Sequence, residues 1–238
     1  DLVRRNKVEI AFIVAYEAGQ AQLAVDRFRS AGVKHFVIRA ATHAAITHDA
    51  SDFARHTVPV LKEYAVALGG SENMLIAVHN EPNAVGEGFG SAWETGHEFG
   101  GWFAQVAAIY RAELSGCKLG FPALSPGGGV PAVRTDEETF AKQARAAMLS
   151  ADWIGVHYYW TKPDGSDIAP LRSRWSQLYG GRPLVGTEIG PADGVKITAE
   201  ALRKAYLWFG VNSIPMMSWV LNGAGDWKNA EWVSNGVI

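Results

Sequence analysis

The chain has 238 residues, which suits one large α/β domain and is long enough to bury most of the surface that an unfolded chain exposes. Hydrophobic residues make up 48% of it and charged residues 19%, which excludes a disordered chain. The formal net charge of −2 gives no electrostatic reason to expect nucleic acid or an anionic membrane surface as a partner, and the apolar runs are too short to span a bilayer. A single cysteine, Cys117, excludes an internal disulfide.

Apolar runs of strand length alternate along the chain with amphipathic stretches of helical periodicity. The predicted strands begin near residues 8, 35, 74, 118, 153, 183 and 215. The predicted helices cover 20–31, 51–68, 97–115, 135–150 and 198–209. This alternation predicts repeated right-handed βαβ units and a parallel sheet. An eight-stranded TIM-type (β/α)8 barrel is the natural architecture, with one strand and helix unit missing or irregular in the N-terminal half.

Capping residues, glycine and proline indicate where the predicted helices begin and end. Ser51 can cap the second predicted helix, Gly69 ends it, and Pro59 inside it predicts a kink or a restart. Thr135, with Glu138 three residues further on, has the spacing of a capping box for the fourth predicted helix.

The segment Met74–Asn83 carries the first chemical signal. It begins as an apolar run and ends in a histidine, two asparagines and Glu81, and Pro82 cannot donate to a strand ladder. A carboxylate at the carboxyl end of a buried strand is costly unless its proton chemistry or hydrogen bonding is used. Glu81 is therefore the first candidate for a catalytic residue.

A second acidic strand end lies at 183–190, where Glu188 follows an apolar run as Glu81 does. Two predicted strands, near 118 and 153, separate them, so the two carboxylates lie three units apart. In a barrel, strand ends three units apart face each other across the mouth. Two facing carboxylates can split a glycosidic bond, since one protonates the leaving oxygen while the other attacks the sugar carbon.

With these segments the sequence resembles clan A, the large group of retaining glycoside hydrolases with (β/α)8 barrels whose acid/base and nucleophile end strands four and seven. The resemblance covers roughly residues 35 to 222. The motifs that carry it are His79-Asn80-Glu81-Pro82-Asn83, His157-Tyr158-Tyr159-Trp160, Thr187-Glu188 and Ser218-Trp219.

The resemblance implies a role for each matching residue. Glu81 would be the acid/base and Glu188 the nucleophile, and Asn80 would hydrogen-bond the sugar hydroxyl next to the reacting carbon. The other implied site residues are His157 lining the site, Tyr159 touching the nucleophile, Trp219 flooring the central sugar subsite, and Arg39.

The residues themselves agree with part of this assignment. His157 and Tyr159 have the same strand parity and so project to the same side. Trp160 and Trp219 close predicted strands, where a flat aromatic ring can stack on the apolar face of a sugar.

The N-terminal half departs from the family pattern. Only about thirty residues separate Arg39 from Met74, and they contain no extra strand signal. Either the first unit is lost and 35–41 is strand three, which makes His43 the rim residue, or strand three is deleted and Arg39 is the arginine beneath the nucleophile. We favour the second reading, because Ala31-Gly32-Val33 before a strand ending in arginine is the usual lead into strand two.

We therefore expect a single barrel domain over 1–238 that acts as a retaining glycoside hydrolase on a poly- or oligosaccharide. The alternatives are a carbohydrate-binding barrel without catalysis and a transglycosylase that uses the same residues. No cofactor is expected, and the histidines lack the spacing of a metal site. Nucleic acid and membrane are not expected partners.

The compartment stays open, with a slight preference for a secreted or extracellular protein. The chain starts at Asp1 rather than Met, so we expect it to be processed or cut from a longer chain whose other domains would be its partners.

Overall fold

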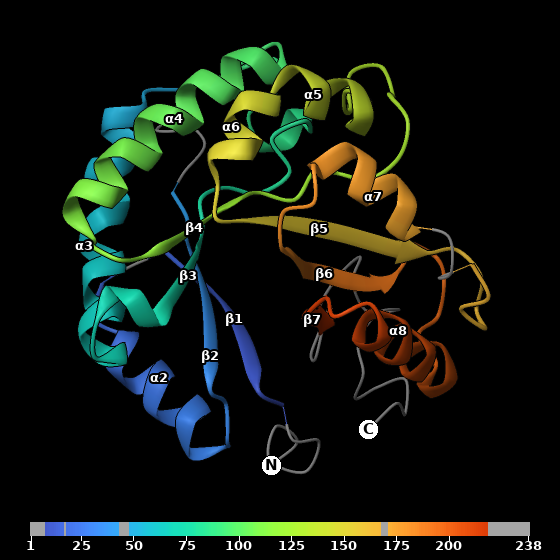
Figure 1. The fold of residues 1–238 in the computed structure, drawn as a ribbon, viewed down its shortest axis with the longest axis horizontal. Coiled ribbons are helices and arrows are strands. Elements are labelled where there is room, and N and C mark those ends of the chain that lie inside the picture. The colour runs from blue at the N-terminus through green and yellow to red at the C-terminus, as the bar shows by residue number, and fades with distance from the viewer. Residues whose placement is uncertain (1–7, 17, 43–47, 168–170, 219–238) are drawn as a thin grey trace. The chain divides into compact units, whose positions relative to one another are not determined.

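The computed structural model describes residues 8–16, 18–42, 48–167 and 171–218 (Figure 1). Its strands are β1 (Ile10–Ala15), β2 (His35–Ala40), β3 (Met74–Ala77), β4 (Lys118–Phe121), β5 (Trp153–Trp160), β6 (Leu184–Pro191) and β7 (Met216–Ser218). Its α-helices are α2 (Ala21–Ser30), α3 (Ala50–Leu68), α4 (Gly96–Glu113), α5 (Glu137–Gln143), α6 (Arg145–Ser150), α7 (Leu171–Tyr179) and α8 (Ala199–Val211). Two short 3₁₀ turns are η2 (Ser71–Asn73) and η3 (Val85–Glu87).

The strands follow one another in the sheet in chain order, from β1 to β7. Every neighbouring pair whose register is defined is parallel. All seven predicted strands are confirmed, and each lies within a few residues of its predicted position. Within the described residues the sheet has no eighth strand, as the count of apolar runs predicted.

Contacts between residues divide the chain into two compact units, 1–155 and 156–238. The division falls inside β5 rather than in a linker, so one strand contributes residues to both units. The expectation of a single domain over the whole chain stays a prediction.

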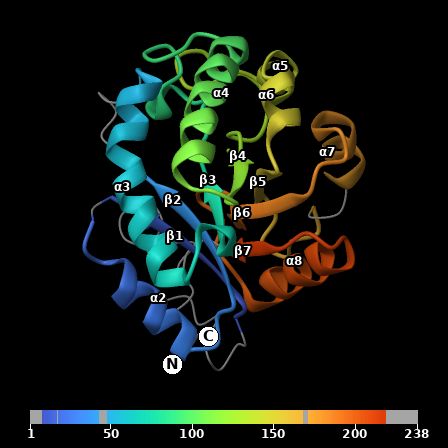
Figure 2. The same ribbon diagram turned by 60° about the vertical axis from the view of Figure 1, so that its left-hand side comes forward.

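In the first unit, helices α2, α3 and α4 lie side by side along the strands β1 to β4 (Figures 1 and 2). The central strands carry apolar side chains without solvent exposure, among them Ile38, Ile76 and Leu119. Burying each such side chain contributes about 1.5–3 kcal/mol. Gly120 lets β5 approach β4, because a Cβ there would lie 2.3 Å from the ring of Trp153.

The second unit contains most of β5, followed by α7, β6, α8 and β7. Trp175 of α7 packs against Phe209 of α8, with ring centroids 6.1 Å apart, and both side chains are buried. Sequence reasoning missed α7. Its sequence, Leu-Arg-Ser-Arg-Trp-Ser-Gln-Leu-Tyr, has five polar or charged residues among its nine, so the apolar positions did not stand out.

Several helix ends differ from those predicted. Asp49, not Ser51, caps α3 by accepting from the Asp52 amide, and α3 runs through Pro59 as one helix. Gly69 ends it in the left-handed conformation, as predicted.

The predicted capping box at Thr135 is wrong. Asp136 caps α5 instead, because its carboxylate accepts from the amide of Thr139. The expected single helix to residue 150 is divided at Ala144 into α5 and α6.

The question of the missing unit stays open. β2 pairs directly with β3, Phe36 opposite Met74, and the described chain between them holds α3 and η2. This pairing fits both readings, the loss of the first unit and the deletion of strand three. His43, the rim residue of the first reading, lies outside the described residues.

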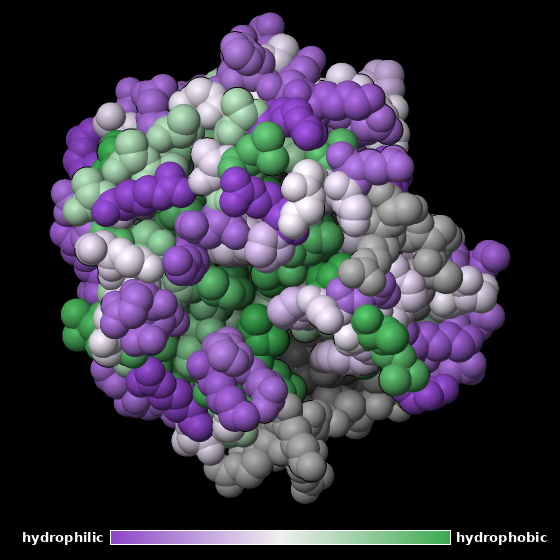
Figure 3. Space-filling model, viewed as in Figure 1, coloured by the Kyte–Doolittle hydropathy of each residue, from purple (hydrophilic) through white to green (hydrophobic). Residues whose placement is uncertain are grey.

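Hydrophilic side chains dominate the periphery of the face in Figure 3, and hydrophobic side chains are exposed in small groups. Such scattered exposure is ordinary for a globular protein. Among the helices that the structure describes, none is both long and apolar enough to cross a membrane.

Candidate active site

Glu188 lies in the carboxyl-terminal half of β6, and its side chain is buried, with 6% of the residue exposed. The hydroxyl of Tyr159 donates a hydrogen bond of 2.7 Å to its Oε2. The Nε2 atom of His157 lies 3.7 Å from its Oε1, beyond hydrogen-bonding distance but close enough for a charge on either group to act on the other. A buried carboxylate is costly unless such partners stabilise it, and Glu188 has them within the second unit.

The alternation of β5 explains this arrangement. His157 and Tyr159 are two residues apart, so both face Glu188, as the parity of the sequence predicted. Tyr158 points the other way, and its hydroxyl donates to the carbonyl oxygen of Asp167 at 2.7 Å.

The local backbone of β6 is irregular where Glu188 lies. Its pairing with β7 shifts register between Gly186 and Ile189. A Cβ on Gly186 would lie 2.9 Å from the side chain of Ile189, so a larger residue here would displace that side chain. An irregularity of this kind re-aims side chains, and it is common beside active sites. The strand also continues to Pro191, so Glu188 precedes the strand end rather than terminating it.

Glu81 lies four residues after the end of β3, in the first unit. Its amide donates to the carbonyl oxygen of Ala123 at 3.0 Å, and its own carbonyl accepts from the amide of Ala84 at 2.8 Å. Its φ is +33°, which non-glycine residues rarely adopt. Such strain costs on the order of 1 kcal/mol or more and clusters at functional sites.

The loop after Glu81 is firmly braced. Asn83 is fully buried; its side-chain nitrogen donates to the carbonyl oxygens of Ser125 and Thr135, and its Oδ1 accepts from the amide of Ser125. The indole of Trp93 donates to the carbonyl oxygen of Pro82 at 2.7 Å. Asn83 therefore fixes the loop rather than contacting a ligand.

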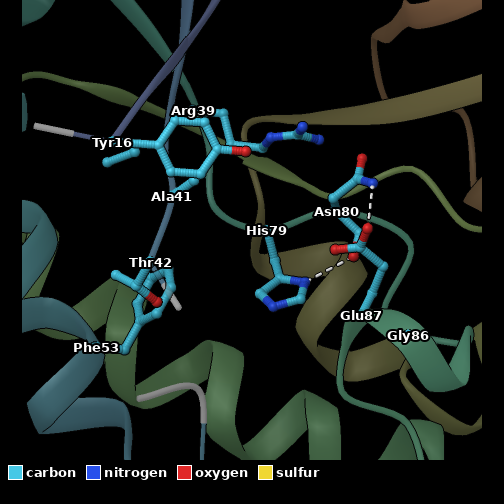
Figure 4. A pocket seen from close by; sticks show the side chains of 10 residues that line it. Tyr16, Arg39, Ala41, Thr42, Phe53, His79, Asn80, Gly86 and Glu87 are labelled. Atoms are coloured by element: carbon cyan, nitrogen blue, oxygen red, sulfur yellow. Dashed lines mark hydrogen bonds between the residues drawn. The ribbon is translucent and has the colours of Figure 1, made fainter. Parts of the chain in front are cut away.

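A pocket of about 220 Å³ opens beside this loop in the first unit (Figure 4). The residues that line it come from the ends of β1 and β2, from α3, from the segment after β3 and from the turn η3. The lining residues are Tyr16, Arg39, Ala40, Ala41, Thr42, Phe53, His79, Asn80, Gly86 and Glu87.

Two predicted site residues, Arg39 and Asn80, line this pocket. The guanidinium carbon of Arg39 lies 5.2 Å from the centroid of the Phe12 ring, a distance typical of a cation–π contact. The side-chain nitrogen of Asn80 donates to Oε1 of Glu87 at 3.2 Å (Figure 4).

His79 is packed among the rings of Trp93, Phe99 and Trp102. Burial lowers the pKa of His79 to about 4, and the charge of Arg39 acts in the same direction, against the hydrogen bond to Asn80. Its Nδ1 lies 2.7 Å from the carbonyl oxygen of Asn80, which can only accept. The imidazole is therefore neutral at neutral pH, with its proton on Nδ1.

Two tryptophans, Trp160 and Trp219, were predicted to stack on sugar rings. Trp160 has no solvent exposure, and its indole nitrogen has no hydrogen-bond partner among the described residues. A stacking platform needs an exposed ring face, so this burial favours packing. Trp219 lies outside the described residues.

Sequence reasoning did not select three of the polar pocket residues, namely Tyr16, His79 and Glu87. His79 stood within the Asn-Glu-Pro motif, and Tyr16 and Glu87 both follow a predicted strand by a few residues. The sequence does show that these residues follow predicted strands, where the site residues of a barrel lie. It does not show which residues of such a loop point into the pocket.

Glu188 and His157 of the second unit offer a carboxylate and an imidazole, which are both common metal ligands. Tyr159 already occupies one oxygen of Glu188. That the protein needs no metal or cofactor stays a prediction, which activity in the presence of a chelator would check.

Comparison with known proteins finds similar folds among solved structures. No family model matches the chain, and no curated protein matches it. Among solved structures, the GH128 subgroup I endo-β-1,3-glucanase of Amycolatopsis mediterranei, in complex with laminaritriose, has a TM-score of 0.54 at 19% identity, covering 90% of this chain and 89% of that one.

Two further structures are similar over most of the chain. The β-mannanase of Thermomonospora fusca, in complex with mannotriose, has a TM-score of 0.61 at 14% identity, covering 93% of this chain and 72% of that one. The GH128 subgroup IV endo-β-1,3-glucanase of Lentinula edodes has a TM-score of 0.59 at 15% identity, covering 92% and 77%.

All three similar structures are glycoside hydrolases, and the chain shares their fold. The predicted class, an α/β fold of the TIM-barrel type with one strand fewer than eight among the described residues, is confirmed. The resemblance to the barrel glycoside hydrolases of clan A is confirmed at the level of the fold.

Proposed function

We propose that this chain is a retaining glycoside hydrolase that cleaves O-glycosidic bonds of a poly- or oligosaccharide, with Glu188 as nucleophile and Glu81 as general acid/base. The observation that carries the proposal is the buried Glu188 carboxylate, which accepts a hydrogen bond from Tyr159 at 2.7 Å and lies beside His157. A carboxylate held in one orientation by a tyrosine suits attack on a sugar carbon.

The reaction would proceed in two displacements. In the first, Glu188 attacks the anomeric carbon while Glu81 gives its proton to the departing oxygen, which leaves a glycosyl ester on Glu188. In the second, Glu81 takes a proton from water, whose oxygen attacks the same carbon and releases Glu188. The strained backbone of Glu81 supports a functional role for that residue.

Asn80 would hydrogen-bond the sugar hydroxyl next to the reacting carbon, a contact that strengthens as charge develops on the sugar. The pocket of the first unit, with its arginine and tyrosine, offers polar groups that can orient sugar hydroxyls. Since the similar enzymes act on β-1,3-glucan and mannan, these polymers are the first substrates to test.

Incubation with a panel of activated 2-fluoro glycosides, followed by intact mass measurement, tests the proposal. The fluorine slows both displacements, and the activated leaving group keeps the first one fast, so the glycosyl enzyme accumulates and is seen as a defined mass increase. The Glu188→Ala variant is the control, because it cannot form the ester. The same panel identifies the sugar class.

Three results separate the candidates. An adduct on Glu188 together with polymer cleavage supports hydrolysis. An adduct that is released faster by added oligosaccharide than by water indicates a transglycosylase. Sugar binding without adduct or cleavage indicates a carbohydrate-binding barrel and overturns the proposal.

A further inference from the structure

The turn η3, which follows the Asn-Glu-Pro segment, carries a carboxylate to which the proposed reaction assigns no role. Glu87 lines the pocket of the first unit, and its Oε1 accepts a hydrogen bond of 3.2 Å from the side-chain nitrogen of Asn80 (Figure 4). Glu87 is an exposed residue, so the fold does not need it for its core. The hydrogen bond therefore joins Asn80, which has a role in the proposed reaction, to Glu87, which has none.

The backbone under Glu87 is fixed. Its amide donates to the carbonyl oxygen of Ala84 at 3.1 Å, and the amide of Ala84 donates to that of Glu81 at 2.8 Å. Gly88, which follows, has a φ of +129°, and a Cβ there would lie 2.8 Å from the ring of Trp93. The turn is thus tied to Glu81 on one side and closed by glycine on the other, which fixes the backbone from which the Glu87 carboxylate reaches Asn80.

Asn80 is held from two directions. The ring of His79 donates to its backbone carbonyl at 2.7 Å, and Glu87 accepts from its side-chain nitrogen. A carboxylate can only accept, so this contact defines which end of the amide faces Glu87. Within the described residues, the amide oxygen and the second N–H of Asn80 have no hydrogen-bond partner, so both can serve a ligand.

We infer that Glu87 is a positioning residue, which orients the Asn80 amide for the sugar hydroxyl next to the reacting carbon. The inference rests on the proposed function and deepens it. Glu87 acts through Asn80 without touching the reacting atoms, so its removal matters only where Asn80 has a hydroxyl to hold.

The test compares Glu87→Ala with the parent on an aryl glycoside and on its 2-deoxy analogue, after subtraction of the spontaneous rate. On the aryl glycoside kcat/KM should fall about tenfold, as for a lost hydrogen bond to a charged group. On the 2-deoxy analogue the two proteins should agree within about twofold. Glu87→Gln, which keeps an acceptor oxygen, should recover most of the loss.

A double-mutant cycle with Asn80→Ala tests whether Glu87 acts through Asn80. Once Asn80 is removed, Glu87→Ala should cost nothing further. The matched control is Glu94→Ala, an exposed carboxylate on the same loop whose side chain does not line the pocket. Equal losses on both substrates, or additive losses in the double variant, would overturn the inference while leaving the hydrolase intact.

A second readout needs no turnover. The side-chain amide of Asn80 gives a ¹H–¹⁵N signal that is identified by its absence in Asn80→Ala. Glu87→Ala should shift this signal, and Glu94→Ala should not. If Glu87→Ala leaves it unmoved, Glu87 does not position Asn80; if the parent cleaves no glycoside, the proposed function fails, and this signal still decides the positioning role.

Discussion

The hydroxyl of Tyr159 lies 2.7 Å from Oε2 of Glu188 and donates a hydrogen bond to it. Both residues belong to the second unit, one on β5 and the other on β6. The bond holds Oε2 of the carboxylate, and the Nε2 atom of His157 lies 3.7 Å from Oε1. In the proposed reaction the tyrosine therefore sets the orientation of the nucleophile before the substrate arrives.

Tyr159→Phe removes this donor and keeps the ring. We expect kcat/KM to fall about 10- to 100-fold, because a hydrogen bond to a charged group contributes about 1.5–3 kcal/mol. The measurement is steady-state hydrolysis of an aryl glycoside.

Tyr158→Phe is the matched control for this experiment, one residue away on the same strand. Its hydroxyl donates to the carbonyl of Asp167, so its loss should lower the free energy of unfolding by about 1 kcal/mol and leave kcat/KM within about threefold. If the two variants lose the same activity, Tyr159 has a structural role and does not act on Glu188.

Glu188→Ala should lower turnover by more than roughly a thousandfold while the fold persists, because the substitution removes the nucleophile. Added azide should restore part of the activity on activated substrates and yield a glycosyl azide of inverted configuration. Glu200→Ala, which removes an exposed carboxylate paired with Lys204 on α8, serves as the control and should be fully active. Activity of Glu188→Ala within a few-fold of the parent would contradict the assignment.

Glu81→Gln should discriminate between leaving groups. For a sugar or another poor leaving group kcat/KM should fall about 10²- to 10⁴-fold, since general acid catalysis is lost. For a strongly activated phenol, which leaves without a proton, kcat/KM should change little, because this parameter reports the first displacement. Equal losses for both leaving groups would show that another residue is the acid.

The strands were predictable because each of the seven begins in or contains a short apolar run, as is typical of a parallel sheet. The helix ends were less predictable. Asp136, rather than Thr135, caps α5, and both residues have a suitable side chain, so only the path of the preceding loop selects one. The helix α7 was missed although Trp175, Leu178 and Tyr179 are buried, because five of its nine residues are polar or charged.

Part of the candidate site was also predictable. The parity that places His157 and Tyr159 on one side follows from the strand period alone, and the structure confirms it. The contact between Asn80 and Glu87 was not predictable, because it depends on the turn η3, which brings together two side chains seven residues apart. The burial of Trp160 depends on packing and likewise leaves no signal in the sequence.

His79 predicts a pH dependence of stability. Its ordinary pKa of 6.5 is lowered to about 4, chiefly by burial, so between these values the unfolded chain binds a proton that the native protein does not. The contribution of His79 to stability should therefore be complete above pH 6.5 and fall as the pH drops toward 4, by at most about 3 kcal/mol, because the ring also lines a pocket where solvent screens its charge. Urea unfolding across this range measures it.

The variant for this test is His79→Asn, which does not titrate and keeps a donor. Its unfolding free energy should depend less on pH between 6.5 and 4 than that of the parent. His56→Asn, at an exposed position on α3, should follow the parent curve. If His79→Asn also follows the parent curve, other groups cause the acid sensitivity.

The stereochemistry of the first product tests the whole assignment. A retaining enzyme forms an ester on its nucleophile and so needs its two carboxyl groups roughly 5 Å apart, whereas an inverting enzyme leaves roughly 6.5–9.5 Å for a water molecule. We expect retention, because Glu188 is buried and oriented by Tyr159 as a nucleophile would be, and because the apparent loss of a unit precedes the strands that carry both glutamates. Proton NMR of the product, recorded before mutarotation, decides between the two outcomes. An inverted first product would make Glu188 a general base that activates water, and the mass adduct with 2-fluoro glycosides should then be absent as well.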